Sequence, residues 1–194
     1  MSRTRPRITE FETPAGALAE LCEGFFEAGH EPTAFNSVEP ESMPDAFRRL
    51  LVHEDHMTTQ LEAYHGRPVE LGVLEYRHEG DLYTRKILLT LEGTDHVVEF
   101  GIMRLDLRQI PESVGKQIID RSAPLGAILI EHDLLRRIEP KWFLRFPGPQ
   151  PQKEYFAEQD GAPVYGRIGM IHCNHEPAIE LLEIVTEKRE PVSE

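Results

Sequence analysis

The sequence predicts an α+β fold, with a six-stranded, mainly antiparallel sheet and helices that flank it. Three observations lead to this prediction. The hydrophobic period is helical up to Gly66 and becomes two after it, which marks a change from helices to strands. Short turn sequences such as HEGD (78–81) and EGTD (92–95) separate the first strands, so hairpins are expected. Helical segments precede the strands and interrupt them once, a segregation that is typical of α+β proteins.

The first part of the chain is expected to hold the leading helices. Residues 14–29 carry apolar side chains at helical spacing, and Gly29 is a candidate stop. Residues 34–44 have the composition of turns. Residues 45–66 predict two short helices, because Asp55 is a candidate N-cap inside the run.

The segments with a period of two predict strands, and one helical insertion divides them. The strands are expected at 67–77, 82–91, 96–107, 136–146, 164–173 and 178–185. The insertion covers 109–132, with Ser122 as a candidate N-cap of its second helix. Residues 147–163, rich in proline and glutamine, predict a long loop. The expected organisation is an N-terminal arm and helix (1–44), one domain (45–188) and a polar tail (189–194).

Composition and charge exclude several classes of function. Asp and Glu outnumber Lys and Arg by 34 to 21, which gives a formal net charge of −13. This balance lacks the basic footprint of a nucleic-acid-binding protein, so no nucleic acid is expected as a partner. The longest apolar run, at 125–130, is too short to cross a membrane, and no secretory signal is evident. The two cysteines, Cys22 and Cys173, are too few for a disulfide framework, so a cytoplasmic location is expected.

Arg85 is an unusual residue for the second predicted strand. Because strand side chains alternate, Arg85 points the same way as Ile87, Leu89 and Leu91. Alternate positions such as Lys86 already supply a polar opposite face. A buried arginine needs a negative partner, which is either a structural carboxylate or the carboxylate of a ligand held by two parallel hydrogen bonds. The residues alone leave both interpretations open.

Glu180 and Glu183 interrupt apolar rows in the last predicted strand. Glu183 shares its face with Leu181 and Val185, whereas Glu180 shares the other face with Leu182. A carboxyl group in such a setting is either paired with a cation or held protonated, and both states are useful in a functional site. The alternatives are a structural ion pair with an arginine and a half-exposed edge strand.

The segment SAPLGAILI (122–130) predicts the start of a helix, with Gly126 in its first turn. Helix N-termini leave backbone N–H groups free to bind anions, and glycine allows a ligand to approach the backbone closely. An ordinary helix start explains the same residues.

Two histidine pairs look like halves of a metal site. His53 and His56 lie three residues apart, and His172 and His175 flank Cys173. Neither pair has the partner half of a zinc pattern, so no metal is expected.

Four of these features occur in an order that resembles the chorismate lyase family, also called chorismate–pyruvate lyases or 4-hydroxybenzoate synthases. They are EDHMT (54–58), TRKILL (84–89), APLG (123–126) and a late hairpin followed by a strand that carries glutamate. The resemblance runs from about Leu50 to Val185. It implies a six-stranded antiparallel sheet with helices, which agrees with the strand count above.

The resemblance also implies which residues contact the substrate. Met57, in EDHMT, would line the substrate pocket. Arg85 falls on the family's arginine and would bind a carboxylate of the substrate or product. Leu125, with its backbone, and Gly126 would lie at the ligand.

The family's glutamate falls most naturally on Glu183, with Glu180 as its rival. Arg167 matches a basic position in some relatives and would line the site. His56 departs from the serine that is common at its position, and the loop at 147–163 is longer than expected, so the product identity stays open.

The function that the resemblance implies is a carbon–oxygen lyase. It would eliminate pyruvate from chorismate and give 4-hydroxybenzoate or a related aromatic acid, without a cofactor. Arg85 would anchor a carboxylate, and Glu183 would donate a hydrogen bond or a proton. The expected partners are chorismate and the aromatic product, with no membrane partner.

The alternative is a binding module that does no chemistry. The same fold serves as an effector-binding domain in a family of bacterial transcription regulators, which carry a DNA-binding helix-turn-helix ahead of it. Fewer than fifty residues precede Leu50 here, which disfavours a regulator on a single chain but not a separate sensor.

Overall fold

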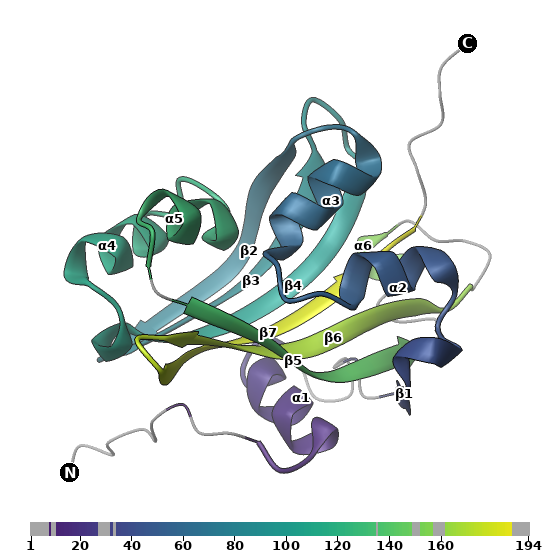
Figure 1. The fold of residues 1–194 in the computed structure, drawn as a ribbon, viewed down its shortest axis with the longest axis horizontal. Coiled ribbons are helices and arrows are strands. Elements are labelled where there is room, and N and C mark those ends of the chain that lie inside the picture. The colour runs from purple at the N-terminus through teal and green to yellow at the C-terminus, as the bar shows by residue number, and fades with distance from the viewer. Residues whose placement is uncertain are drawn as a thin grey trace.

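The computed structural model describes residues 8, 11–26, 32, 34–134, 136–148, 152–156 and 162–187, and within them seven strands form one antiparallel sheet (Figure 1). The strands are β1 (Asn36–Val38), β2 (Val69–Glu79), β3 (Leu82–Leu91), β4 (Val97–Asp106), β5 (Arg136–Phe146), β6 (Val164–Cys173) and β7 (Glu176–Val185). The helices are α1 (Pro14–Cys22), α2 (Asp45–Leu51), α3 (Met57–His65), α4 (Glu112–Asp120), α5 (Leu125–Glu131) and α6 (Gln152–Tyr155). Two short 3₁₀ helices are η1 (Pro40–Ser42) and η2 (Leu107–Gln109).

The α+β class and the antiparallel sheet are confirmed, but the sheet has seven strands in the described residues rather than six. The additional strand, β1, pairs with residues 143–145 of β5. It falls inside the segment 34–44, whose composition predicts turns. Three residues are too few to display a period of two, so only the pairing with β5 defines this strand.

Hairpins connect β2 to β3, β3 to β4 and β6 to β7, as the turn sequences predict. Gly80 and Gly93 adopt positive φ angles in the first two turns. In the third turn Asn174 and His175 both have positive φ, 52° and 70°. Two such residues in a row form the turn whose twist matches that of the flanking strands.

The order of the strands in the sheet differs from their order in the chain. It runs β1-β5-β6-β7-β4-β3-β2. After β4 the chain passes through α4 and α5 and re-enters the sheet at β5, and β6 and β7 then fill the two positions between β5 and β4 (Figure 1). β7 therefore pairs with β4 on one side and β6 on the other, and residues 178–185 are buried.

Helices cover both faces of the sheet (Figure 1). α1 packs on one face, where its apolar side chains join a cluster with Phe100 and Leu182. On the opposite face α4 and α5 pack on a second cluster that contains Met103 and Leu181. α2 and α3 cover a third cluster, which contains Leu89. Met103 and Leu181 of the second cluster and Leu89 of the third also line the pocket described below.

The two predicted helix N-caps are wrong. α3 begins after His56, and the Asp55 carboxylate accepts a hydrogen bond from Nε2 of Gln60 (3.0 Å) instead of capping the helix. α5 begins after Pro124, which leaves Ser122 outside the helix. Capping preferences are worth only about 1 kcal/mol, so tertiary packing of the two helix starts outweighs them.

Four predicted segments lie wholly or partly outside the described residues: the N-terminal arm at 1–7 and 9–10, the end of the first helix at 27–29, the loop at 149–151 and 157–161, and the tail at 189–194. α1 ends at Cys22, earlier than predicted, and α6 lies within the loop predicted at 147–163. No helix in the described ranges is long and apolar enough to cross a membrane.

Candidate functional site

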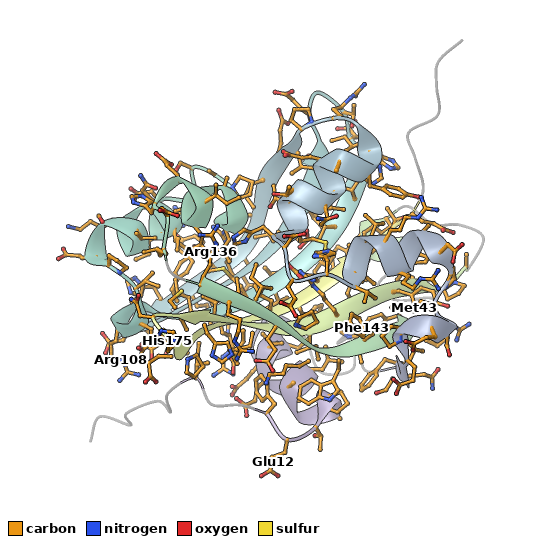
Figure 2. All side chains as sticks on the ribbon, viewed as in Figure 1. Glu12, Met43, Arg108, Arg136, Phe143 and His175 are labelled. Carbon is orange, nitrogen blue, oxygen red and sulfur yellow. The ribbon has the colours of Figure 1, made fainter. Side chains whose placement is uncertain are left out.

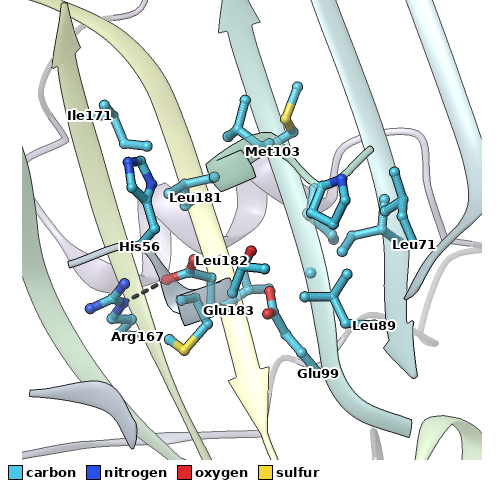
Figure 3. A pocket seen from close by; sticks show the side chains of 18 of the residues that line it. His56, Leu71, Leu89, Glu99, Met103, Arg167, Ile171, Leu181, Leu182 and Glu183 are labelled. Carbon is cyan, nitrogen blue, oxygen red and sulfur yellow. Dashed lines mark hydrogen bonds and ion pairs between the residues drawn. The ribbon is translucent and has the colours of Figure 1, made fainter. Parts of the chain in front are cut away.

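A pocket lies on the sheet between the helix pairs α2–α3 and α4–α5. Side chains of β2 to β7 line its floor (Figure 3). The residues at the starts of α3 and α5 form its roof. It encloses about 570 Å³ including its opening. The apolar lining includes Leu71, Ile87, Leu89, Met103, Ile138 and Leu181, and the polar lining includes His56, Thr58, Arg85, Glu99, Arg167 and Glu183. A mainly apolar pocket with a few polar groups is typical of a small-molecule site.

Gly101 opens the floor of the pocket. On β4 it lies between Ile87 of β3 and Glu183 of β7, in one row across the sheet. A Cβ atom at Gly101 would lie 3.0 Å from Oε1 of Glu99 and 3.1 Å from Cγ1 of Ile87. Because glycine has no side chain, the pocket extends down to the backbone of β4 at this position.

Arg85 is enclosed at one end of the pocket, opposite Met103 on β4, and is only 2% exposed. Its Nη1 donates one long hydrogen bond of 3.4 Å to the carbonyl of Ile118, and its Nε has no hydrogen-bond partner among the residues that the structure describes. In the described part of the chain no carboxylate lies within ion-pair distance of this guanidinium. Burial lowers the pKa of Arg85, and Tyr83 partly offsets this, but an arginine keeps its charge. The pocket therefore holds a buried positive charge that no carboxylate of the described residues neutralises.

Glu183 has a partner, and that partner is Arg167 rather than Arg85. The two residues face each other across β7 and β6, and Nε of Arg167 donates to Oε2 of Glu183 at 2.5 Å (Figure 3). Nη1 of the same guanidinium donates to the carbonyls of Leu51 (3.1 Å) and His53 (2.9 Å). Arg167 therefore ties the sheet to the loop that follows α2 and forms one wall of the pocket.

Glu99 is a second carboxyl group in the pocket, which the sequence analysis misses. It is 4% exposed, and its side chain points toward Glu183 in Figure 3. Its Oε2 has no hydrogen-bond partner within the described part of the chain. Burial raises the pKa of Glu99 well above its ordinary value, the Glu183 carboxylate adds to the rise, and Arg167 opposes it. Alternation along β4 places Glu99 on the same face as Gly101 and Met103, and this parity is the sequence signal that could have found it.

His56 closes the pocket toward an outer cleft that Glu54, Thr59 and Arg136 also line. Nε of Arg136, where β5 begins beside α5 (Figure 2), donates to Nε2 of His56 at 2.7 Å. Because arginine only donates, the proton of the neutral ring is on Nδ1. Burial, together with the Arg136 charge, lowers the pKa of His56 to about 4, so the ring is neutral at pH 7.

The roof of the pocket consists of the start of α3, which carries Met57, and the start of α5, which carries Gly126. Met57 is buried at the start of α3, and Gly126 is buried in the first turn of α5. A Cβ atom at Gly126 would lie 3.0 Å from Cβ of His56 and 3.2 Å from Oγ1 of Thr58. Glycine is therefore needed for the start of α5 to rest on the segment that leads into α3.

The five predicted site residues all line this pocket: Met57, Arg85, Leu125, Gly126 and Glu183. Arg167 lines it as well. Glu180 lies on the opposite face of the sheet, where Arg104 contacts both its carboxylate (3.1 Å) and that of Glu20 in α1 (2.8 Å). The structure thus places Glu183 in the pocket and Glu180 on the other face of the sheet, a choice that the sequence leaves open.

The histidine pairs have other partners. Nε2 of His53 donates to the carbonyl of Leu50 at 2.7 Å, and His172 lies 3.1 Å from the Glu139 carboxylate. Within the residues that the structure describes, no three side chains of His, Cys, Asp or Glu gather as a metal site would require.

No family model matches the sequence, and no curated protein sequence matches it either. Solved structures do match. PhnF from Mycobacterium smegmatis gives a TM-score of 0.53 at 11% identity, over 71% of this chain and 66% of that chain. The effector domain of PhnF, solved separately, gives 0.49 at 13% identity, over 71% and 91%. The ligand-binding domain of a provisionally assigned GntR-family transcriptional regulator from Bordetella bronchiseptica gives 0.47 at 13% identity, over 62% and 87%.

These likenesses concern the fold. The chain has the chorismate lyase-like α+β fold that the resemblance implied, and it shares this fold with PhnF. The prediction of a lyase is contradicted by the match of the fold to PhnF, a protein with an effector domain. Short motifs at the pocket follow the fold and do not specify a reaction, since one fold serves several functions.

Proposed function

We propose that this chain is a binding domain for a small organic acid, held in the pocket between α2–α3 and α4–α5. The ligand's carboxylate would bind Arg85, and its apolar body would lie on the floor near Gly101. The observation that carries the proposal is the buried charge of Arg85, which no carboxylate in the described residues neutralises. A buried cation without a partner costs free energy, so the site favours an anion that supplies the missing charge.

A carboxylate suits this pocket better than a phosphate. The planar guanidinium of Arg85 matches a carboxylate through two parallel hydrogen bonds. Arg167, the other arginine of the lining, is already engaged by Glu183 and two backbone carbonyls. One available cation balances one negative charge, and the apolar lining favours an aromatic or aliphatic body.

Two observations support binding without turnover. The resemblance would make Glu183 a hydrogen-bond or proton donor, yet its carboxylate is engaged by Arg167 at 2.5 Å. The likeness of the fold to PhnF, a protein with an effector domain, also favours a binding role.

Isothermal titration calorimetry with benzoate, 4-hydroxybenzoate and uncharged benzamide tests the proposal. We expect both acids to bind and benzamide not to bind. The variant Arg85→Met should weaken benzoate binding by roughly ten- to a hundredfold, because a charge-assisted hydrogen-bond pair is lost. The control Arg48→Met, which removes an exposed guanidinium paired with Asp45, should bind like the wild type. The proposal would be refuted if neither acid binds, or if Arg85→Met binds benzoate as tightly as the wild type does.

A second assay separates binding from catalysis. The protein is incubated with chorismate, and pyruvate is measured against a sample without protein. We expect no release above that background. Release that disappears in Arg85→Met would restore the lyase assignment.

A further inference from the structure

Arg85 and Glu99 mark two ends of the pocket floor. Arg85 pairs with Met103 and Glu99 pairs with Leu89, so four residues, or about 13 Å of strand, separate the two positions. Figure 3 shows Met103 and Glu99 at opposite ends of the view into the pocket. Gly101 lies midway and adds no side chain. An elongated ligand that binds Arg85 through its carboxylate would therefore direct its other end toward Glu99.

Among the described residues, no cation around Glu99 is free to pair with its carboxyl group. The groups that act on it are Glu183 from β7 and Arg167 from β6, while Asp55 and His56 face the same pocket from the roof. Arg167 is bound to Glu183, and the His56 ring is neutral at pH 7. Ionising two neighbouring buried carboxyl groups costs much free energy. Because Arg167 pairs with Glu183, Glu99 is the group that keeps its proton.

We propose that Glu99 is a specificity-determining residue of this pocket, whose carboxyl O–H donates a hydrogen bond to an acceptor at the end of the ligand remote from its carboxylate. The inference rests on the proposed function. It narrows the ligand class to acids with one carboxylate and a hydroxyl, ether or carbonyl oxygen at the far end. The buried and unpartnered Oε2 of Glu99 would thereby gain a partner.

The same arrangement disfavours a second negative charge at the far end of the ligand. A carboxylate there would lie beside Glu99 and Glu183, close to no cation that is free to pair with it. Repulsion of this kind is a means of selecting one ligand against another.

The test compares benzoate, 4-methoxybenzoate and terephthalate by calorimetry on the wild-type protein. These acids carry no far-end group, an acceptor and a second carboxylate, respectively. We expect 4-methoxybenzoate to bind more tightly than benzoate by roughly three- to tenfold, the effect of one buried hydrogen bond. Terephthalate should bind more weakly than benzoate. As the pH rises and Glu99 ionises, the preference for 4-methoxybenzoate should disappear.

Two variants assign the effect to Glu99. Glu99→Gln keeps an N–H donor, so it should keep the preference for 4-methoxybenzoate at every pH. Glu99→Met should still bind benzoate but bind 4-methoxybenzoate no better, and should tolerate terephthalate. Thermal denaturation checks that each variant folds.

The outcomes distinguish this inference from the proposed function. If benzoate binds with dependence on Arg85 but Glu99→Met keeps the wild-type ranking, Glu99 does not select the ligand and the inference is overturned. The same holds if Glu99→Gln loses the preference while it still binds benzoate. If no acid binds the wild type, the proposed function fails, and the role of Glu99 fails with it.

Discussion

Nε of Arg167 lies 2.5 Å from Oε2 of Glu183, whereas Arg85, on the same face of the sheet, has no carboxylate partner in the described residues. The pocket thus holds two buried arginines in different states. One is neutralised by the protein, and the other is available to a ligand. Their substitutions should therefore change stability in opposite directions.

Arg85→Met should stabilise the protein without ligand. The substitution removes a buried charge that has one long hydrogen bond and no counter-ion, and methionine fills a similar volume. We expect the free energy of unfolding to rise by about 1–3 kcal/mol, a gain in stability at the cost of binding. Urea denaturation measures it, with Arg48→Met as the exposed control. A loss of stability in Arg85→Met would show that the arginine serves a structural role.

Arg167→Met should destabilise the protein strongly. It leaves the Glu183 carboxylate buried without a partner and removes the hydrogen bonds to the carbonyls of Leu51 and His53. The expected loss in free energy of unfolding is about 3–5 kcal/mol. The double variant with Glu183→Leu should recover part of it, because the orphaned charge is gone. If the two substitutions prove additive in a double-mutant cycle, the ion pair does not couple the strands.

Glu180 should make stability depend on pH. Burial raises its pKa from 4.5 to about 7, with Arg104 opposing the rise and Glu20 adding to it. The folded state therefore holds the proton more tightly than the unfolded state. The contribution of Glu180 to the free energy of unfolding is fully present below pH 4.5 and is lost as the pH rises through 7.

Glu180→Gln should lose less stability than the wild type over the same pH window, because the amide cannot ionise. Urea denaturation at several pH values compares the two proteins. Glu41→Gln, an exposed position in η1, is the control and should follow the wild-type curve. Parallel curves for Glu180→Gln and wild type would contradict the assignment of the pH dependence to Glu180.

Two glycines of the sheet should respond differently to substitution. At Gly101 a side chain would project toward Glu99 and Ile87, so Gly101→Val should weaken benzoate binding by about tenfold or more by filling the pocket.

At Gly166 a Cβ atom would lie 2.6 Å from the backbone oxygen of Glu183. Gly166→Ala should therefore reduce the free energy of unfolding by about 1–3 kcal/mol. Calorimetry and urea denaturation separate the two effects, and unchanged affinity in Gly101→Val would place the ligand elsewhere.

Much of the fold was predictable because the signals are local. The bounds predicted for β5 and β6, 136–146 and 164–173, match the structure residue for residue. β1 escaped prediction because three residues carry no period. The N-cap positions of α3 and α5, His56 and Pro124, were not predicted, because packing between the two helices outweighs the local capping preference.

The sequence by itself determined the direction of side chains. Alternation places Arg85 on one face of its strand and puts Glu180 and Glu183 on opposite faces of theirs, because successive side chains of a strand point to opposite sides. The tertiary structure alone decided which of these residues meet. Because β7 inserts between β4 and β6, Glu183 pairs with Arg167 and Glu180 pairs with Arg104. Arg85 is left without a carboxylate partner among the described residues. Strand order depends on contacts between distant segments, and no pattern within a single strand encodes it.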